Sequence, residues 1–231
     1  MKIDLLREKR TYLEKLGKNG PDNGKQMYQM ICNVTAAVLE DHYEKSVSEI
    51  SFPVDIRGIV KRYEIEIIET DLNTDIGFQA ARQNGSLRYL PEDRVQIYLE
   101  ASDSENAKRY ILAHEFCYFL MNTAGDTQNV GCGNPMMPKE WEELTADMMA
   151  ACLLFPPELV MKKMRSFIDQ MGEEKRYPIS PVKWLEELSE SAQVSLYYTT
   201  ISYQYIRSFI CYLYNADDSV ATAGQFAGLF K

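Results

Sequence analysis

The chain has 231 residues and a formal net charge of −9, from 25 Lys and Arg against 34 Asp and Glu. Its 45% hydrophobic and 26% charged residues are typical of a folded globular domain and exclude a disordered chain. The acidic excess argues against a nucleic-acid-binding protein, because a nucleic-acid surface needs clustered positive charge. We therefore expect no direct contact with nucleic acid.

The cysteines and the N-terminus indicate where the protein works. Five Cys without close-spaced pairs predict reduced thiols, as in the cytoplasm. Residues 1–18 are charged throughout, so we expect no signal peptide there. The apolar stretches are too short to cross a membrane, and we expect a cytoplasmic protein without a membrane partner.

The N-terminal part of the sequence has the apolar spacing of helices. Helices are predicted over 1–19 and 25–42, separated by a loop rich in Gly and Asn. A third helix is expected to open at Phe52-Pro53, since proline is tolerated in the first turn of a helix.

From Glu64 the apolar period changes to that of strands. Residues 64–67 and 94–100 alternate between apolar and polar side chains, as half-buried strands do. Shorter strands are expected over 77–81 and 86–90, with Asn84-Gly85 as the hairpin turn between them. The strand at 94–99 could pair with the backbone of an extended substrate if it lies at an edge.

The second half of the chain is predominantly helical. A loop rich in Gly and Pro is expected over 123–138, and Ser208–Tyr214 is aromatic enough to predict a late strand. The order of helices, strands and helices predicts an α+β fold. The predicted helices cover 104–121, 139–154, 158–171, 181–189 and 196–208. The predicted division is an N-terminal helical segment (1–50), a core (51–160) and a C-terminal helical region with a tail (161–231).

The most informative motif lies in the helix predicted over 104–121. His114, Glu115 and Tyr118 read as HExxY, one residue away from the HExxH of zinc peptidases. In HExxH, positions i and i+4 share one helix face, so two imidazoles reach the same ion. The glutamate takes a proton from the metal-bound water. A single HExxY match has low specificity.

Two acidic residues on the next predicted helix strengthen the motif. Glu143 could supply an oxygen ligand, which would give the His₂Glu pattern of thermolysin if a second histidine were present. Asp147, one turn further on, could accept a hydrogen bond from the ring of His114. The alternative is that Glu143 belongs to a solvated acidic face with Glu140 and Glu142.

At this point the chain resembles the ImmA/IrrE family of metallo-endopeptidases, over roughly residues 51–205. The order of the matching segments is more specific than any one motif. These segments are Pro53–Ile56, the strand at Ile65, Ile97–Leu99, Ile111–Phe116, Glu143, Ala146-Asp147, Ala150–Pro156 and Gln193–Ser195.

The resemblance implies a zincin-like domain with a small mixed or antiparallel sheet and an active-site helix pair. It implies zinc as the cofactor, with His114 and Glu143 as metal ligands, Glu115 as the general base and Asp147 as the partner of His114. Relatives in this family cut a repressor protein, so a protein or peptide substrate is implied here.

Tyr118 departs from the family pattern, which has its second histidine ligand at this position. Three interpretations compete: a Tyr118 phenolate binds the metal, a thiol of Cys117 or Cys132 replaces the histidine, or metal binding is lost or weakened. The expected loss of metal affinity favours the third interpretation. Removing even a group that only orients a ligand costs about 10–100-fold in affinity or activity.

Two functional hypotheses follow. The first is an ImmA/IrrE-like metallopeptidase, impaired or active, that acts on a protein partner such as a transcriptional repressor. The second is a pseudo-peptidase that binds a peptide or regulates a partner without cutting it; a sensor for a small ligand is a weaker third. The tyrosines between 197 and 214 predict core or protein-interface packing rather than base stacking, because little positive charge accompanies them.

Overall fold

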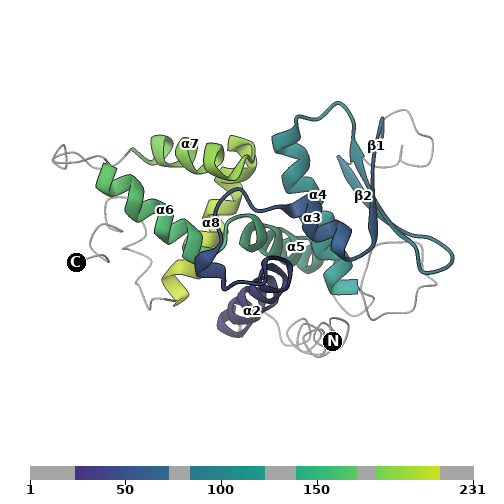
Figure 1. Cartoon of the computed structure of the whole chain (residues 1–231), viewed down its shortest axis with the longest axis horizontal. Coiled ribbons are helices and arrows are strands. Elements are labelled where there is room, and N and C mark those ends of the chain that lie inside the picture. The colour runs from purple at the N-terminus through teal and green to yellow at the C-terminus, as the bar shows by residue number, and fades with distance from the viewer. Residues whose placement is uncertain (1–23, 73–83, 123–138, 171–179, 214–231) are drawn as a thin grey trace.

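The computed structural model describes residues 24–72, 84–122, 139–170 and 180–213 (Figure 1). The helix expected over 1–19, the strand over 77–81, the loop over 123–138 and the tail after residue 213 lie outside these ranges. The helices are α2 (Gly24–Tyr43), the short 3-10 helix η2 (Val47–Glu49), α3 (Ile56–Arg62), α4 (Glu105–Asn122), α5 (Lys139–Leu154), α6 (Pro157–Gln170), α7 (Pro181–Ala192) and α8 (Leu196–Leu213). The strands are β1 (Ile65–Thr70), β2 (Gly85–Tyr89) and β3 (Val95–Glu100).

The strands form one small mixed sheet in the order β1-β3-β2. β3 pairs in parallel with β1 and antiparallel with β2, so the predicted α+β fold with a small mixed sheet is confirmed. The prediction that residues 94–99 could pair with a substrate backbone is wrong, because β3 is the central strand. Its inner side chains, among them Ile97 and Leu99, are fully buried.

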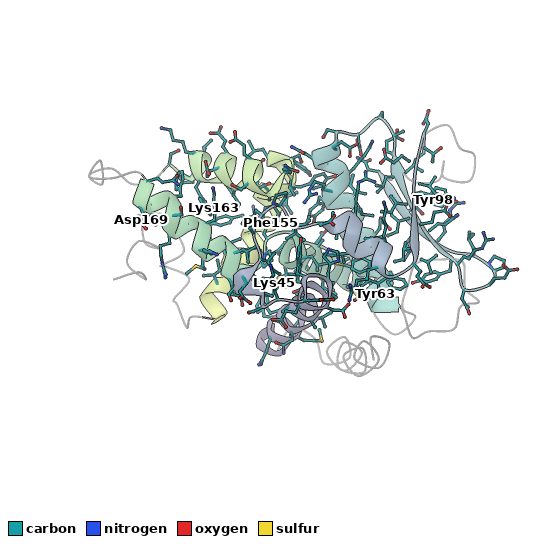
Figure 2. The ribbon with its side chains drawn as sticks, in the orientation of Figure 1. Lys45, Tyr63, Tyr98, Phe155, Lys163 and Asp169 are labelled. Carbon is teal, nitrogen blue, oxygen red and sulfur yellow. The ribbon has the colours of Figure 1, made fainter. Side chains whose placement is uncertain are left out.

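The outer face of the sheet is polar and turned away from the helices. Tyr98 lies on this face (Figure 2), where its hydroxyl donates to Gln96 Oε1 at 2.6 Å. Arg88 lies over the Tyr98 ring, 5.1 Å from its centroid. The sheet therefore has one buried face and one solvated face, as an alternating sequence pattern predicts.

Helix α4 is the centre of the fold. It lies between the sheet and α5, while α5 also packs against α2 and α8 (Figure 1). From Tyr110 to Met121 every residue is buried except His114 and Glu115, which are partly exposed. A helix that is apolar nearly all round must be covered on all sides, and its few polar residues need partners.

Three predicted boundaries differ from the structure. Asp55 caps α3, accepting a hydrogen bond from the Gly58 N–H at 2.9 Å, so Pro53 precedes the helix. Gly85 is the first residue of β2 rather than a turn residue. The late strand at 208–214 is wrong, because α8 continues to Leu213. Ile206, Phe209 and Ile210 are buried at helical spacing, and this packing outweighs their β-propensity.

No single helix among the described residues is long and apolar enough to cross a membrane. Among these residues, the segments Glu142–Leu154 of α5 and Pro157–Gln170 of α6 are long and apolar enough only when taken together, and the two segments are bent by 51° relative to each other.

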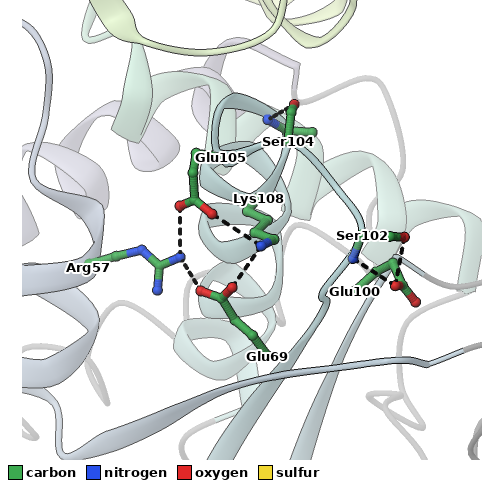
Figure 3. Close-up of polar contacts among 8 residues, drawn as sticks. Arg57, Glu69, Glu100, Ser102, Ser104, Glu105 and Lys108 are labelled. Carbon is green, nitrogen blue, oxygen red and sulfur yellow. Dashed lines mark hydrogen bonds and ion pairs between the residues drawn. The ribbon is translucent and has the colours of Figure 1, made fainter.

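The start of α4 is fixed by a charged cluster that joins three elements (Figure 3). Lys108 Nζ contacts Glu69 Oε2 of β1 at 2.7 Å and Glu105 Oε1 at 3.1 Å. Arg57 of α3 contacts the same two carboxylates at 2.6 and 3.3 Å. The Lys108 side chain is only 6% exposed, so its charge depends on these partners.

We expect Lys108→Met to lower the free energy of unfolding by about 1–3 kcal/mol, because it leaves Glu69 with fewer charged partners. Hydrogen bonds from Lys108 and Arg57 lower the pKa of Glu69. The stabilisation is therefore present at neutral pH and is lost as the pH falls through the Glu69 pKa. Urea denaturation at neutral and acidic pH measures both effects.

The matched control is Lys163→Met, which removes a more exposed pair with Glu187 at 2.5 Å. We expect it to cost less than about 1 kcal/mol. Equal losses in the two variants would show that the Lys108 cluster contributes no more than a surface ion pair.

Candidate functional site

The site is built on the facing sides of α4 and α5. Glu143 and Asp147 are four residues apart on α5, so both carboxylates lie on one face of that helix, one turn apart. His114 of α4 lies between them. Its Nε2 is 3.5 Å from Glu143 Oε2, and its Nδ1 is 2.9 Å from Asp147 Oδ1. The structure thus brings together the three residues that the sequence spacing had predicted to meet.

This environment favours a charged imidazole. Burial lowers the pKa of His114, but the contacts with Asp147 and Glu143 outweigh burial and raise the pKa to about 9. The Nδ1–Asp147 contact is an ion pair whose angle is poor for a hydrogen bond. Without a bound ion, the two carboxylates therefore favour the protonated imidazole at neutral pH, and a metal would have to displace a proton to bind Nε2.

The alternative of a solvated acidic face does not hold for Glu142. Glu142 is only 4% exposed. The Glu143 side chain is half exposed, but it contacts His114 and forms a hydrogen bond with Tyr118. Glu143 is thus at the edge of the site, with one side open to solvent.

Tyr118 lies where a second metal-binding histidine is expected. It is 6% exposed, and its ring packs edge-on against His114 with the centroids 5.1 Å apart. Burial, the hydrogen bond to Glu143 and nearby carboxylates all raise the pKa of Tyr118. The surroundings therefore stabilise the neutral phenol, the opposite of what a phenolate ligand requires.

Glu115 faces the sheet side of α4. Burial raises its pKa to about 7; the charge of His114 lowers it, Glu143 raises it, and a hydrogen bond from the Leu87 backbone N–H lowers it. The backbone of β2 also approaches α4 closely at Gly85. A Cβ added to Gly85 would be 2.4 Å from Ile111 Cγ2 and 3.3 Å from Glu115 Oε1. The absence of a side chain at Gly85 lets β2 approach Glu115.

Two tyrosines that the sequence analysis had not assigned to the site complete it. Tyr110 donates a hydrogen bond from its hydroxyl to Asp147 Oδ1 at 2.9 Å. Its ring stacks on Tyr198 of α8, with centroids 4.3 Å apart and an interplanar angle of 11°. The sequence contains a signal for Tyr110, which is one turn before His114 on the same helix face. The sequence contains no signal for Tyr198, which reaches Tyr110 only through the packing of α8 against α4.

The thiol alternatives receive no support from the described residues. Cys117 is completely buried in the core, and burial raises its pKa. Cys132 lies outside the described residues.

The residues present do not fit a zinc site. A catalytic zinc has three protein ligands, and this site offers one imidazole and one carboxylate on its Nε2 side. Asp147 contacts the opposite nitrogen, and Tyr118 is a neutral phenol. Across the described ranges, no group of three or more His, Cys, Asp or Glu side chains could hold a metal ion.

Comparison with known proteins gives one match. Residues 60–196, more than half of the chain, match the family model described as the IrrE N-terminal-like domain, Peptidase_M78. This range contains the sheet, α4 and α5. No curated protein and no solved structure gives a significant match.

We expect ¹H–¹⁵N NMR to show His114 protonated at pH 7 and titrating near pH 9. Asp147→Asn should lower this pKa, because it removes the charge next to Nδ1. The folded pKa is above the 6.5 of an unperturbed histidine, so this stabilisation is complete below about pH 6.5 and is lost as the pH rises through about 9.

The chain has only two histidines, so His42→Gln leaves a single imidazole signal and assigns His114 directly. A midpoint at or below 6.5 for His114 would show that the two carboxylates do not hold the proton.

Proposed function

This chain belongs to the IrrE N-terminal-like (Peptidase_M78) family, which is metallopeptidase-like, and we propose that it is a pseudo-peptidase: it binds a polypeptide segment at the α4–α5 site without zinc-dependent hydrolysis. The family acts on proteins, which supports a protein or peptide partner. A transcriptional repressor is one candidate for that partner.

One observation carries the proposal. Glu143, the residue expected to bind a metal, faces two proton donors, the His114 imidazolium and the Tyr118 hydroxyl. The Glu143 carboxylate thus interacts with proton donors of the protein where it would otherwise bind a metal ion. The site keeps the paired helices and the carboxylates that the family motif predicts, while the donor set for zinc is incomplete.

The remaining expectations stand as parts of this proposal. The protein is cytoplasmic and has neither a membrane nor a nucleic acid as its direct partner. The core at 51–160 carries the α4–α5 site, and the flanking segments 1–50 and 161–231 support it.

A second candidate, an active metallopeptidase, is favoured by Glu115. Its pKa of about 7 is suited to a group that accepts and returns a proton at neutral pH. In this alternative His114, Glu143 and Tyr118 would be the zinc ligands and Asp147 would orient His114. Tyr118 would then have to bind zinc as a phenolate.

Tyr118→His separates the two candidates. The wild-type protein should retain substoichiometric zinc after incubation with ZnCl₂ and gel filtration, as measured by mass spectrometry of the metal. The variant restores a nitrogen donor one turn from His114 and releases Glu143 from the phenol. Its zinc affinity should rise by more than about 100-fold, because even a group that only orients a ligand is worth about 10–100-fold.

Tyr118→Phe is the control, since it removes the hydroxyl without adding a nitrogen, and it should bind no more zinc than the wild type. In the Tyr118→His background, Glu143→Ala should abolish the gain. Stoichiometric zinc in the wild-type protein, together with peptide cleavage that Glu115→Gln abolishes, would instead establish the active metallopeptidase.

A further inference from the structure

We propose that the tyrosine platform, defined as Tyr110, Tyr197 and Tyr198, together with Asp103, receives an arginine side chain of the bound polypeptide. This inference rests on the proposed function and adds to it a preferred chemistry for the partner. The argument starts from the rings and proceeds to the carboxylates beside them.

The platform leads from the α4–α5 site to the surface. Tyr110, bonded to Asp147, stacks on Tyr198, and Tyr198 meets Tyr197 edge-on with centroids 5.1 Å apart. Exposure increases along this series: Tyr110 is buried, Tyr198 is half-buried and Tyr197 is 69% exposed. The three rings therefore connect the buried centre of the site to solvent.

The exposed end of the platform is unusual for this molecule. Among the described residues, the exposed large hydrophobic side chains are Val182, Leu196 and Tyr197. Leu196 and Tyr197 are consecutive at the start of α8, and Tyr197 is itself part of the platform. Leu196 and Tyr197 thus present apolar surface to solvent at the exposed end of the platform.

The platform is held in a fixed position relative to His114. The backbone N–H of Ser195 donates to the carbonyl oxygen of Asn106 at 3.2 Å, which joins the start of α8 to the first turn of α4. The Thr199 N–H donates to the Ser195 carbonyl at 2.9 Å, so α8 continues directly from this junction. Because α4 also carries His114, a ligand on the platform is placed relative to the site.

Two carboxylates act on the platform: Asp147, which contacts His114, and Asp103. Burial raises the pKa of Tyr198, and Asp103, Tyr197 and Asp147 raise it further, so both carboxylates act on this ring. Asp103 Oδ2 is screened from water and has no hydrogen-bond partner in the described structure. A carboxylate oxygen without a donor is costly. A cationic donor would relieve that cost once the partly exposed Asp103 carboxylate turns to present Oδ2 to it.

An arginine fits this combination better than other groups. Its guanidinium is planar, stacks on aromatic rings and donates two parallel hydrogen bonds to a carboxylate. An aromatic or aliphatic side chain could cover the rings but would leave Asp103 Oδ2 without a donor. A phosphate would be repelled by Asp103, Asp147 and the overall charge of −9.

The test is selection of peptides from a random phage-displayed library on the immobilised full-length protein. The wild type should enrich peptides that carry arginine at a fixed position. Replacing that arginine by citrulline, which has nearly the same shape but no charge, should weaken binding by about 10-fold or more. Asp103→Asn and Tyr197→Ala should each reduce this citrulline effect, as a double-mutant cycle measures.

Val182→Ser is the matched control, because it removes an exposed hydrophobic side chain from α7 and should leave the citrulline effect unchanged. Circular dichroism and the melting temperature show that each variant is folded. If the wild type selects peptides without arginine, or if the citrulline effect persists in both platform variants, this inference is overturned while the proposed function stands. If the wild type selects no peptide at all, the proposed function fails and this inference fails with it.

Discussion

The α4–α5 site is organised around the imidazole ring of His114, which lies between two carboxylates. The imidazole of His114 contacts Glu143 through one nitrogen and Asp147 through the other, at 3.5 and 2.9 Å. This places a charged group between two largely apolar helices, where each charge needs the others to offset its loss of water. The same arrangement fixes which turn of α4 faces which turn of α5, and it brings Tyr118 and Tyr110 to the two carboxylates.

A proton and a metal ion compete for the same groups in such a site. Carboxylates that would bind zinc also raise the pKa of an imidazole between them, so a site with too few donors is filled by protons instead. In the proposed pseudo-peptidase, Tyr118 decides this competition, because its hydroxyl engages Glu143 without offering the imidazole nitrogen of the HExxH motif. The family fold and the proposed metal-free chemistry are therefore compatible, because the contacts of His114 with Glu143 and Asp147 join α4 to α5 without a bound ion.

The local parts of this account could be predicted from the sequence. Glu143 and Asp147 could be placed on one helix face because they are four residues apart, and His114 could be paired with them because the zinc-peptidase pattern has an acidic ligand on the next helix. Helix α5 was predicted with its observed ends. Pairing between distant segments could not be predicted from local pattern. The central position of β3 depends on β1 and β2 together, and Tyr198 reaches Tyr110 only through the packing of α8. The helical end of α8 was missed because buried Phe209 and Ile210 outweigh local propensity.

The platform at the start of α8 carries the proposed chemistry toward the surface, where Asp103 is the carboxylate that would pair with an incoming arginine. The central claim is that protons, not a metal ion, occupy the position between His114 and Glu143. The most direct measurement is an anomalous difference map, collected at the zinc edge, from crystals grown with excess zinc. We predict no peak between His114 Nε2 and Glu143 Oε2, with the Tyr118 hydroxyl within hydrogen-bond distance of Glu143. A strong peak ligated by His114, Glu143 and a third protein donor would contradict the account.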